Sequence, residues 1–429
     1  MPEPHGDAFV AAAGPHERVC SFGTEGGGMP VEVIFFNVGQ GDCTFLWFYE
    51  APGGGSGLSN PASRVGVGAA LIDCGSLLAT PHRSTAGLPG TDDARMVGHI
   101  RRVIADRLGR NAGASKDRLE YLFLSHPDAD HHNKLEDLLC NSAGTLDFGI
   151  QEVWYTGDPK SYHKGKTNSF LYKLLKPGQR GSLTNGPHAV ANDAEAKNLQ
   201  SSVLPVPLPA APSGNPLPEL LLVSSSLYAE VSGKKVVSKS RGSRDSTWSN
   251  AASLVFLLSG QPGASDGKRQ KVLLMADAER GVEEFLMMGD RDARYQRDKN
   301  MWLKAGHHGS AHATSEDWVK HTTPDALFFS SGRKTFGGTG MPADARLNAI
   351  RKTLADEHIP QPAITPAGPH PYGFFQRGAT PPFVVQTTTE GFCTSLAEAP
   401  PPAGREWLGV DWHLILDDPQ PGDYHLEYA

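Results

Sequence analysis

The chain has 429 residues, which is long enough to bury one large hydrophobic core or roughly two to three smaller ones. Its 40 basic and 47 acidic residues give a formal net charge of −7, which disfavours a protein that coats DNA through a basic surface. The 48 Gly and 33 Pro residues indicate many loops, but their share stays below the roughly 25–30% that is typical of low-complexity chains.

The cysteines and the hydropathy pattern indicate a cytoplasmic protein. The five cysteines are scattered and include no CxxC pair, so neither a disulfide framework nor a zinc ribbon is expected. No segment reaches the roughly 18–20 apolar residues of a membrane span, and residues 1–20 lack the basic region that begins a secretory signal. Association with a membrane-bound partner stays open, and the sequence identifies no protein partner.

The first predicted elements are strands. Residues 1–30 are expected to be a flexible lead-in, because no periodic pattern there could bury a face. Runs of β-branched and aromatic residues predict strands at 31–38, 43–49 and 67–75. Residues 91–110 have apolar side chains at helical spacing, acids at the start and a glycine near the end, and they predict an amphipathic helix.

Strands and helices alternate through most of the remaining chain. Further strands are predicted at 119–125, 150–155, 220–224, 253–259, 271–276, 301–305 and 326–330. Further helices are predicted at 133–140, 279–288, 314–321 and 343–357. This alternation predicts one α/β layered domain over residues 31–395.

Residues 157–250 interrupt the alternation with a Pro-, Ser- and Gly-rich sequence, which predicts a loop-rich insertion. The insertion contains a basic segment with five cationic residues, Lys234, Lys235, Lys239, Arg241 and Arg244. This segment is interpreted either as a solvated loop or as a contact for a phosphate backbone. Residues 396–429 are expected to form a C-terminal extension with one strand at 412–418.

The segment LFLSHPDADHHNKLEDLL places four metal-type side chains directly after an apolar strand. His126, Asp128, Asp130 and His131 follow that strand within six residues. Each of them alone is more often structural, but imidazole and carboxylate groups at alternate positions of one turn can point at one ion or at two. The cluster therefore predicts metal ligation.

Two later strands end in the same way. Asp277 follows an apolar strand just before a predicted helix, where it is either a helix cap or a carboxylate that bridges two ions. His307 and His308 follow another strand and are flanked by Gly306 and Gly309, which allow the backbone to approach a site closely. Active sites gather at the carboxyl ends of strands in α/β folds, so these segments are expected to meet.

In this order, the motifs resemble those of the metallo-β-lactamase superfamily. They are VGQGD (38–42), LIDCG (71–75), SHPDADHH (125–132), ADAE (276–279) and KAGHHGS (304–310). Over 31–395 the chain is similar in particular to the soluble hydrolase domain of ComEC-type competence DNA-uptake proteins. The resemblance implies an αββα sandwich of two central sheets with outer helices, here with the insertion and the C-terminal extension, and a metal site along one edge.

The resemblance also implies a site for two divalent metal ions, zinc or manganese. His126 and Asp128 would serve the first ion, and Asp130 and His131 the second. Asp277 would bridge the two ions.

Two further roles follow from the same resemblance, and a third follows from sequence position alone. His307 would complete the second site, and an exchange of roles with His308 stays open. Asp73 would orient the metal-binding loop through hydrogen bonds. His308, Lys304 or Ser310 would contact the leaving group or a phosphate oxygen.

The chain departs from the family pattern at several positions. The usual third histidine of the first site has no clear match, and His163, His188 and Asp158 are the candidates. Asn37 replaces the first aspartate of the family's DVGQGD motif, and Met341 replaces a downstream histidine. One tightly held and one weakly held ion is therefore an alternative to full occupancy.

The predicted function is that of a metal-dependent hydrolase, most plausibly a phosphodiesterase or nuclease that uses a metal-bound hydroxide. Asp130, Asp277 and His308 would be its catalytic residues. Metal binding would lower the pKa of water from 15.7 to about 7 and so supply a nucleophile at neutral pH. The alternatives are hydrolysis of a small phosphodiester, thioester or lactam, and a partner-binding regulatory protein that retains the fold.

Overall fold

A computed structural model describes the parts of the chain that carry the strands, the helices and the site. The described residues are 20–21, 29–36, 38, 40–50, 64–77, 93–156, 162, 171, 174, 183–189, 204–211, 213–224, 229–231, 234–236, 246–263, 267–290, 292–298, 300–324, 326–331, 335–336, 339–357, 383–387, 410–416 and 426–428.

One large sheet contains both the early strands and the last ones. Its members are β1 Cys20–Ser21, β2 Val31–Phe35, β3 Thr44–Glu50, β4 Val65–Ile72, β5 Arg118–Leu124, β6 Gly149–Tyr155, β7 Leu183–Ala189, β19 Val410–Leu416 and β20 Leu426–Tyr428. The order across this first sheet is β1-β19-β2-β3-β4-β5-β6-β7, with β20 paired to β19. From β4 to β7 the strands run parallel, so their carboxyl ends lie at one edge.

A second sheet is built from the later half of the chain. Its strands are β8 Leu204–Val206, β9 Glu219–Ser224, β12 Val255–Ser259, β13 Gln270–Leu274, β14 Asn300–Lys304, β15 Ala326–Ser330 and β18 Phe383–Thr387. The order is β18-β15-β14-β13-β12-β9-β8, and β13, β14, β15 and β18 are parallel. Two small hairpins lie outside both sheets and are formed by β10 Ala229–Val231 with β11 Lys234–Val236, and by β16 Thr335–Phe336 with β17 Thr339–Gly340.

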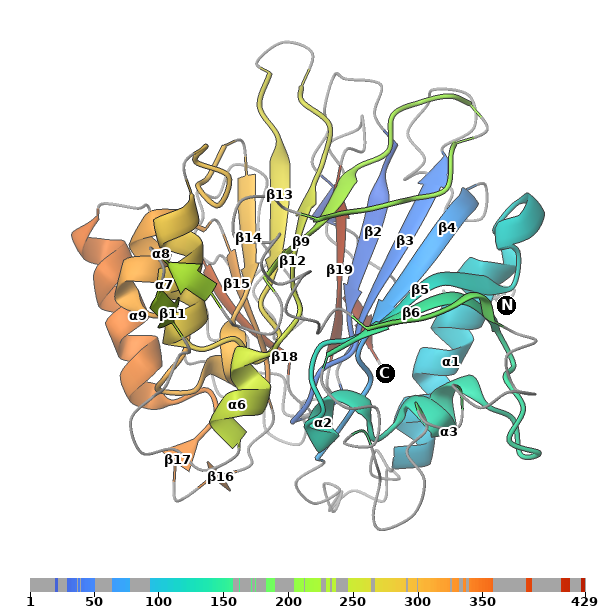
Figure 1. Ribbon diagram of the computed structural model, residues 1–429, viewed down its shortest axis with the longest axis horizontal. Coiled ribbons are helices and arrows are strands. Elements are labelled where there is room, and N and C mark those ends of the chain that lie inside the picture. Colours follow the sequence, from blue (N-terminus) through green and yellow to red (C-terminus); the bar gives the residue numbers. More distant parts are fainter. Residues whose placement is uncertain are drawn as a thin grey trace, which may run out of the picture.

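Helices cover the outer faces of the two sheets. The described helices are α1 Asp93–Gly109, α2 Ala129–His132, α3 Leu135–Leu139, α6 Ser246–Ala251, α7 Arg280–Gly289, α8 Glu316–Thr322 and α9 Asp344–Asp356, together with 3-10 turns at Gly113–Ser115 and Gly306–Gly309. In Figure 1, α1 and α3 lie outside the first sheet and α7, α8 and α9 lie outside the second. The predicted αββα sandwich is therefore confirmed.

Three apolar clusters hold these layers together. Between the sheets, Phe123 of β5 and Phe256 of β12 are fully buried, with ring centroids 4.5 Å apart. A second cluster joins the first sheet to α1 and α3, and a third joins the second sheet to α7, α8 and α9. The helical spacing that predicts α1 is the spacing of its buried face, which includes Ile100 and Ile104.

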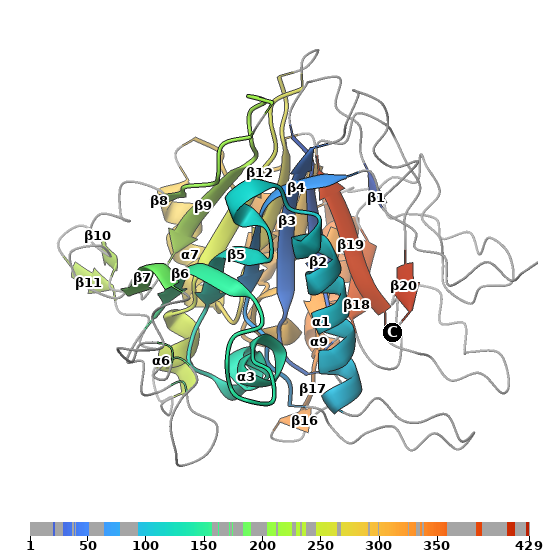
Figure 2. The same ribbon diagram turned by 90° about the vertical axis from the view of Figure 1, so that its right-hand side faces the viewer.

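The strand predicted at 412–418 is present as β19, and it is part of the first sheet. It pairs antiparallel with β2 in the register Leu414↔Val33, and β1 pairs parallel with its other edge. Figure 2 shows β19 beside β2, with β1 and β20 next to it. The first sheet thus combines strands from the lead-in, the predicted domain and the C-terminal extension, while the domain boundaries at 30 and 395 stay a prediction.

The other predicted strands and helices are found within a few residues of their predicted bounds. The helix predicted at 133–140 is divided, because α2 ends at His132 before α3 begins at Leu135. Strand β9 in the predicted insertion is present, whereas the strands β7, β8 and β18 and the helix α6 were not predicted. None of the described helices combines the length and apolar character needed to cross a membrane.

The inter-sheet core gives a stability prediction. Replacing the buried Phe256 by Ala should lower the free energy of unfolding by about 3–5 kcal/mol, because the lost ring leaves a cavity between the two sheets. The same truncation at Met288 of α7, which is 60% exposed, should change it by less than about 0.5 kcal/mol. Urea unfolding of both variants measures the difference, and equal effects would contradict the proposed core.

Candidate metal centre

The metal-type side chains predicted from the sequence meet where the two sheets present the carboxyl ends of their parallel strands. Asp73 follows β4, and residues 126–131 follow β5 of the first sheet. Asp277 follows β13, and residues 306–309 follow β14 of the second sheet. The site therefore takes its side chains from both sheets.

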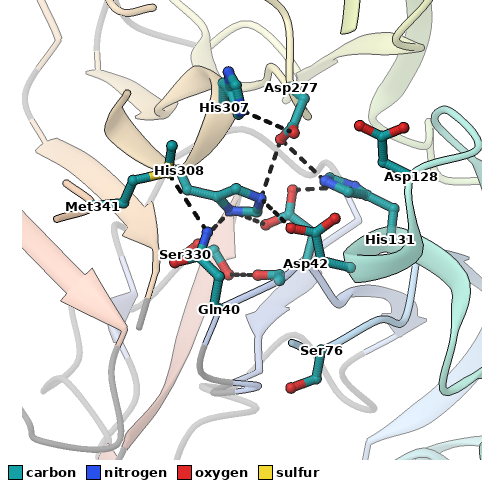
Figure 3. Close-up of polar contacts among 12 residues, drawn as sticks. Gln40, Asp42, Ser76, Asp128, His131, Asp277, His307, His308, Ser330 and Met341 are labelled. Carbon is teal, nitrogen blue, oxygen red and sulfur yellow. Dashed lines mark hydrogen bonds and ion pairs between the residues drawn. The ribbon is translucent and has the colours of Figure 1, made fainter. Parts of the chain in front are cut away.

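Asp277 lies at the centre of this site, and its side chain is 3% exposed. The Nε2 atoms of His131 and His308 lie 3.0 and 3.3 Å from its Oδ1 atom. The Nε2 atoms of His126 and His307 lie 3.6 and 3.7 Å from its Oδ2 atom. Figure 3 shows His131, His307 and His308 arranged around this carboxylate.

The other ring nitrogen of each histidine lies next to a protein oxygen. Nδ1 of His131 is 2.8 Å from Asp73, and Nδ1 of His126 is 3.0 Å from the Ser125 hydroxyl. Nδ1 of His307 is 3.0 Å from Glu279 Oε1, and Nδ1 of His308 is 2.5 Å from the Ser330 carbonyl. Histidines that bind metals typically donate this second N–H to a carboxylate or a carbonyl, which directs the free nitrogen at the ion.

Asp73 makes the hydrogen bonds predicted for it. Its Oδ1 accepts from the backbone N–H of Ser125 at 2.8 Å, and its Oδ2 accepts from the Ser125 hydroxyl at 2.6 Å. Together with its contact to His131, these bonds fix both ends of the loop 125–131. The orienting role predicted for Asp73 is therefore supported by three contacts.

The donor atoms at the centre fit divalent metal ions. Among the described residues, Nε2 of His126, His131 and His308 and Oδ1 of Asp277 are buried without a hydrogen-bond partner, which is costly for polar atoms. Two ligand atoms about 2.1 Å from a tetrahedral ion lie about 3.4 Å apart, and the distances from these nitrogens to Asp277 fall around that value. His126, His131 and Asp277 form one such group of donor atoms, and Asp130, His131 and His308 form another.

The structure brings together all six predicted ligands, but to different degrees. Asp130 Oδ2 lies 3.5 Å from His308 Nε2, and Asp128 Oδ2 lies 3.7 Å from His126 Nε2. His308 belongs to two of the tightest groups of donor atoms, whereas His307 belongs to none of them. His308 therefore shares a group of donor atoms with Asp130 and His131, beside which His307 was predicted.

Asp42 belongs to the site and was not predicted. Its side chain is 3% exposed, forms an ion pair with Lys304, and lies 3.7 Å from Nδ1 of both His131 and His308. The signal was present in the VGQGD motif, which ends in this aspartate just before β3. Lys304 is buried and forms an ion pair with Asp42, and Ser310 is also buried. Their contact with a leaving group or a phosphate oxygen stays a prediction.

Several other predicted positions are outside the described part of the structure. These are Asn37, His163, Asp158 and the side chain of His188. The other departure, Met341, lies beside the VGQGD loop, where its sulfur accepts a hydrogen bond of 3.7 Å from Gln40.

Close backbone contacts explain the glycines around the site. A Cβ atom on Gly75 would lie 2.2 Å from the backbone carbon of Asp130, and one on Gly306 would lie 2.1 Å from the carbonyl oxygen of Ala278. His307 and His308 both adopt left-handed backbone angles, with φ of 42° and 52°. Such strain in non-glycine residues is found mostly at functional sites.

The nearby carboxylates raise the pKa values of the buried imidazoles. Burial and the neighbouring His131 lower the pKa of His126, but Asp128 and Asp277 raise it to about 9. Burial likewise lowers the pKa of His131, but Asp277 and Asp73 raise it well above its ordinary value. Without a metal ion, protonated imidazoles therefore balance the carboxylates, and metal binding has to displace these protons.

The carboxylates show the opposite shift. Burial raises the pKa of Asp277, but the imidazoles of His308, His131 and His307 lower it well below its ordinary value. Burial also raises the pKa of Asp130, but His308 and His131 lower it to about 2. Both carboxylates are therefore ionised at neutral pH and available as ligands.

Comparisons with known proteins give a distant structural likeness. No protein-family model matches the sequence, and no curated protein matches it. Among solved structures, the chain is similar to a long form RNase Z from yeast, with 12% sequence identity and a TM-score of 0.34. The similarity covers 81% of this chain and 42% of that one, so the chain spans less than half of that protein. A likeness at this level identifies neither a family nor a substrate.

The raised imidazole pKa values predict how the metal-free protein responds to pH. The folded-state pKa of His126 is about 9, above its ordinary value of about 6.5. Its stabilising contribution is therefore complete below pH 6.5 and is lost as the pH rises towards 9. Thermal unfolding in the presence of a chelator should show a melting temperature that falls over this range, and His126→Gln should reduce the fall. A melting temperature that is constant from pH 6.5 to 9 would contradict the proposed charge balance.

Proposed function

We propose that this protein is a metal-dependent hydrolase of the metallo-β-lactamase type that cleaves phosphodiester bonds. The observation that carries the proposal is the arrangement of four imidazoles around one buried carboxylate. Each imidazole has one nitrogen next to a protein oxygen and directs the other at Asp277. A core histidine would satisfy both nitrogens, whereas Nε2 of His126, His131 and His308 is buried without a hydrogen-bond partner, as expected for atoms that bind a cation.

The proposed ligands are the side chains that the family resemblance assigns, together with the second of the tandem histidines. They are His126, Asp128, Asp130, His131, Asp277, His307 and His308. Imidazole and carboxylate donors are compatible with zinc and with manganese. When bound, such ions supply Lewis-acid chemistry that lowers the pKa of water and polarises a phosphoryl oxygen.

The residues of the chain would fix the geometry and the charge of the reaction. Asp277 holds ligand atoms from both sheets in one place. Asp130 is ionised at neutral pH and 12% exposed, so its carboxylate can accept a hydrogen bond from an attacking water molecule and orient it. The Lys304 ammonium neutralises the charge of the Asp42 carboxylate, so Asp42 adds no net negative charge beside the other carboxylates.

A nucleic acid is the substrate that we propose first. The family branch that the motifs resemble acts in DNA uptake, and the basic segment 234–244 could contact a phosphate backbone. Within this segment the structure describes the backbone of Lys234 and Lys235 in β11, whereas Lys239, Arg241 and Arg244 lie outside the described residues. The charge of −7 means that such contacts would be local.

Metal analysis and a substrate panel test the proposed activity. Purified protein should contain a divalent metal and should hydrolyse at least one of single-stranded DNA, double-stranded DNA, RNA and bis(p-nitrophenyl) phosphate. Asp277→Asn keeps the shape of the side chain but removes its charge, and it should lower the hydrolysis rate at least about 100-fold and reduce metal content. His312 is exposed and lies four residues after His308, and His312→Ala should retain both the hydrolysis rate and the metal content. Metal-free wild-type protein that is inert on the whole panel would instead favour a partner-binding role.

The basic segment gives a separate test of the substrate. Replacing its five cations by Gln should weaken nucleic-acid binding and flatten the dependence of binding on salt, because fewer counterions are released. Hydrolysis of bis(p-nitrophenyl) phosphate should not change. Binding that is insensitive both to salt and to these substitutions would point to a small phosphodiester, thioester or lactam as the substrate.

A further inference from the structure

The tandem histidines point at different atoms of the central carboxylate. Their left-handed backbone turns the adjacent side chains apart, so that the two rings are 6.1 Å apart with an angle of 63° between their planes. His308 Nε2 is 3.3 Å from Asp277 Oδ1, whereas His307 Nε2 is 3.7 Å from Asp277 Oδ2 (Figure 3). Neighbouring residues in the sequence therefore lie on two sides of one carboxylate.

Each oxygen of Asp277 has its own set of neighbours. On the Oδ1 side, His131 and His308 approach together, and Asp130 lies 3.5 Å from His308. On the Oδ2 side, His126 and His307 approach, and Asp128 lies 3.7 Å from His126. The ligand types match between the two sides, with two imidazoles, one aspartate and one oxygen of Asp277 in each set.

The two sides differ in exposure. The side chains of His131, His308 and Asp130 are 0%, 1% and 12% exposed. On the other side, His307 and Asp128 are 23% and 36% exposed, while His126 is fully buried. The set of side chains around Oδ1 is therefore closed to solvent, and the set around Oδ2 is partly open to it. These two sets are called the closed and the open position below.

Two consecutive residues of α6 hold the outer ligands of the open position. Ser249 Oγ donates a hydrogen bond of 2.7 Å to Asp128 Oδ1. Asn250 Nδ2 donates to Glu279 Oε1 at 3.0 Å and lies 3.3 Å from Nδ1 of His307, the ring that Glu279 orients. After α6, the N–H of Leu254 donates to the Ser125 carbonyl, next to His126, at 3.0 Å.

We propose that His307 and His308 bind different metal ions and that α6 acts as a clamp, meaning that its residues hold the side chains of the open position in place. His308 serves the closed position with His131 and Asp130. His307 serves the open position with His126 and Asp128, and so takes the place of the third histidine that the sequence lacks there. Ser249 and Asn250 are positioning residues that act through Asp128 and through Glu279 and His307. This inference rests on the proposed metal-dependent function.

Metal stoichiometry tests how the histidines are divided. Protein dialysed against zinc at a fixed, buffered free concentration should hold two ions in the wild type and one in His307→Ala and in His308→Ala. The double variant of both histidines should hold none, because it damages both positions. His307→Ala combined with Asp128→Ala should still hold one ion, whereas His307→Ala combined with Asp130→Ala should hold none.

Several outcomes would overturn the division. One ion left in the double histidine variant would mean that both rings serve the same position, and two ions in His307→Ala would mean that this ring binds none. Wild-type protein without zinc would instead overturn the proposed function itself. His312→Ala is the matched control and should hold two ions, and circular dichroism should show that every variant is folded. Where an alanine variant is not folded, Gln replaces the histidine, or Asn the aspartate, at the same position.

The role of α6 has its own test. Ser249→Ala with Asn250→Ala should weaken the binding of one ion about 10–100-fold and leave the other unchanged, as expected for residues that orient ligands. Isothermal titration with zinc measures the two affinities, and Ser249→Thr with Asn250 intact should restore the weaker one. An equal loss of affinity for both ions, or no loss of affinity for either, would overturn the proposed role of α6.

Discussion

The structure depends on the convergence of four imidazoles on the buried carboxylate of Asp277. Burying this many ionisable groups is unfavourable unless each has a partner of opposite charge or a cation between them. Because Asp277, His307 and His308 come from the second sheet and His126 and His131 from the first, the same interactions join the two halves of the sandwich. The site therefore connects the two sheets at the carboxyl ends of their parallel strands.

The surrounding backbone is shaped to allow this convergence. Gly75 and Gly306 lie so close to other loops that no side chain fits, and the left-handed residues His307 and His308 direct neighbouring rings to opposite sides of Asp277. Both features are unfavourable for an isolated loop and are offset by the packing of the strands that end there. Further hydrogen bonds hold the side chains of the site, since Asp73 bonds to Ser125 at the start of the loop 125–131, and Ser249 and Asn250 of α6 bond to Asp128 and Glu279.

Much of the fold followed from local sequence patterns. Strands β2 to β6 and β12 to β15 were predicted because each is a short apolar run bounded by turn-forming residues, and α1 because its apolar residues recur at helical spacing. The strands β7, β8 and β18 were missed because they lack such a run or lie in Pro-rich sequence, so their pairing depends on neighbours that are distant in the chain. A local pattern reports which residues can be buried, but not which strand lies beside which.

The same division applies to the site. By itself the sequence determined which side chains could form a metal site, since His126, Asp128, Asp130, His131 and Asp277 follow apolar strands and imidazole and carboxylate groups are side chains that divalent metals prefer. Only the tertiary structure decided that Asp42 joins them, that Lys304 is its partner, that His307 and His308 face different oxygens, and that Ser249 and Asn250 reach the outer ligands. The physical reason is that side-chain type is local, whereas a site depends on distances of a few ångströms between residues that lie up to 262 positions apart in the chain.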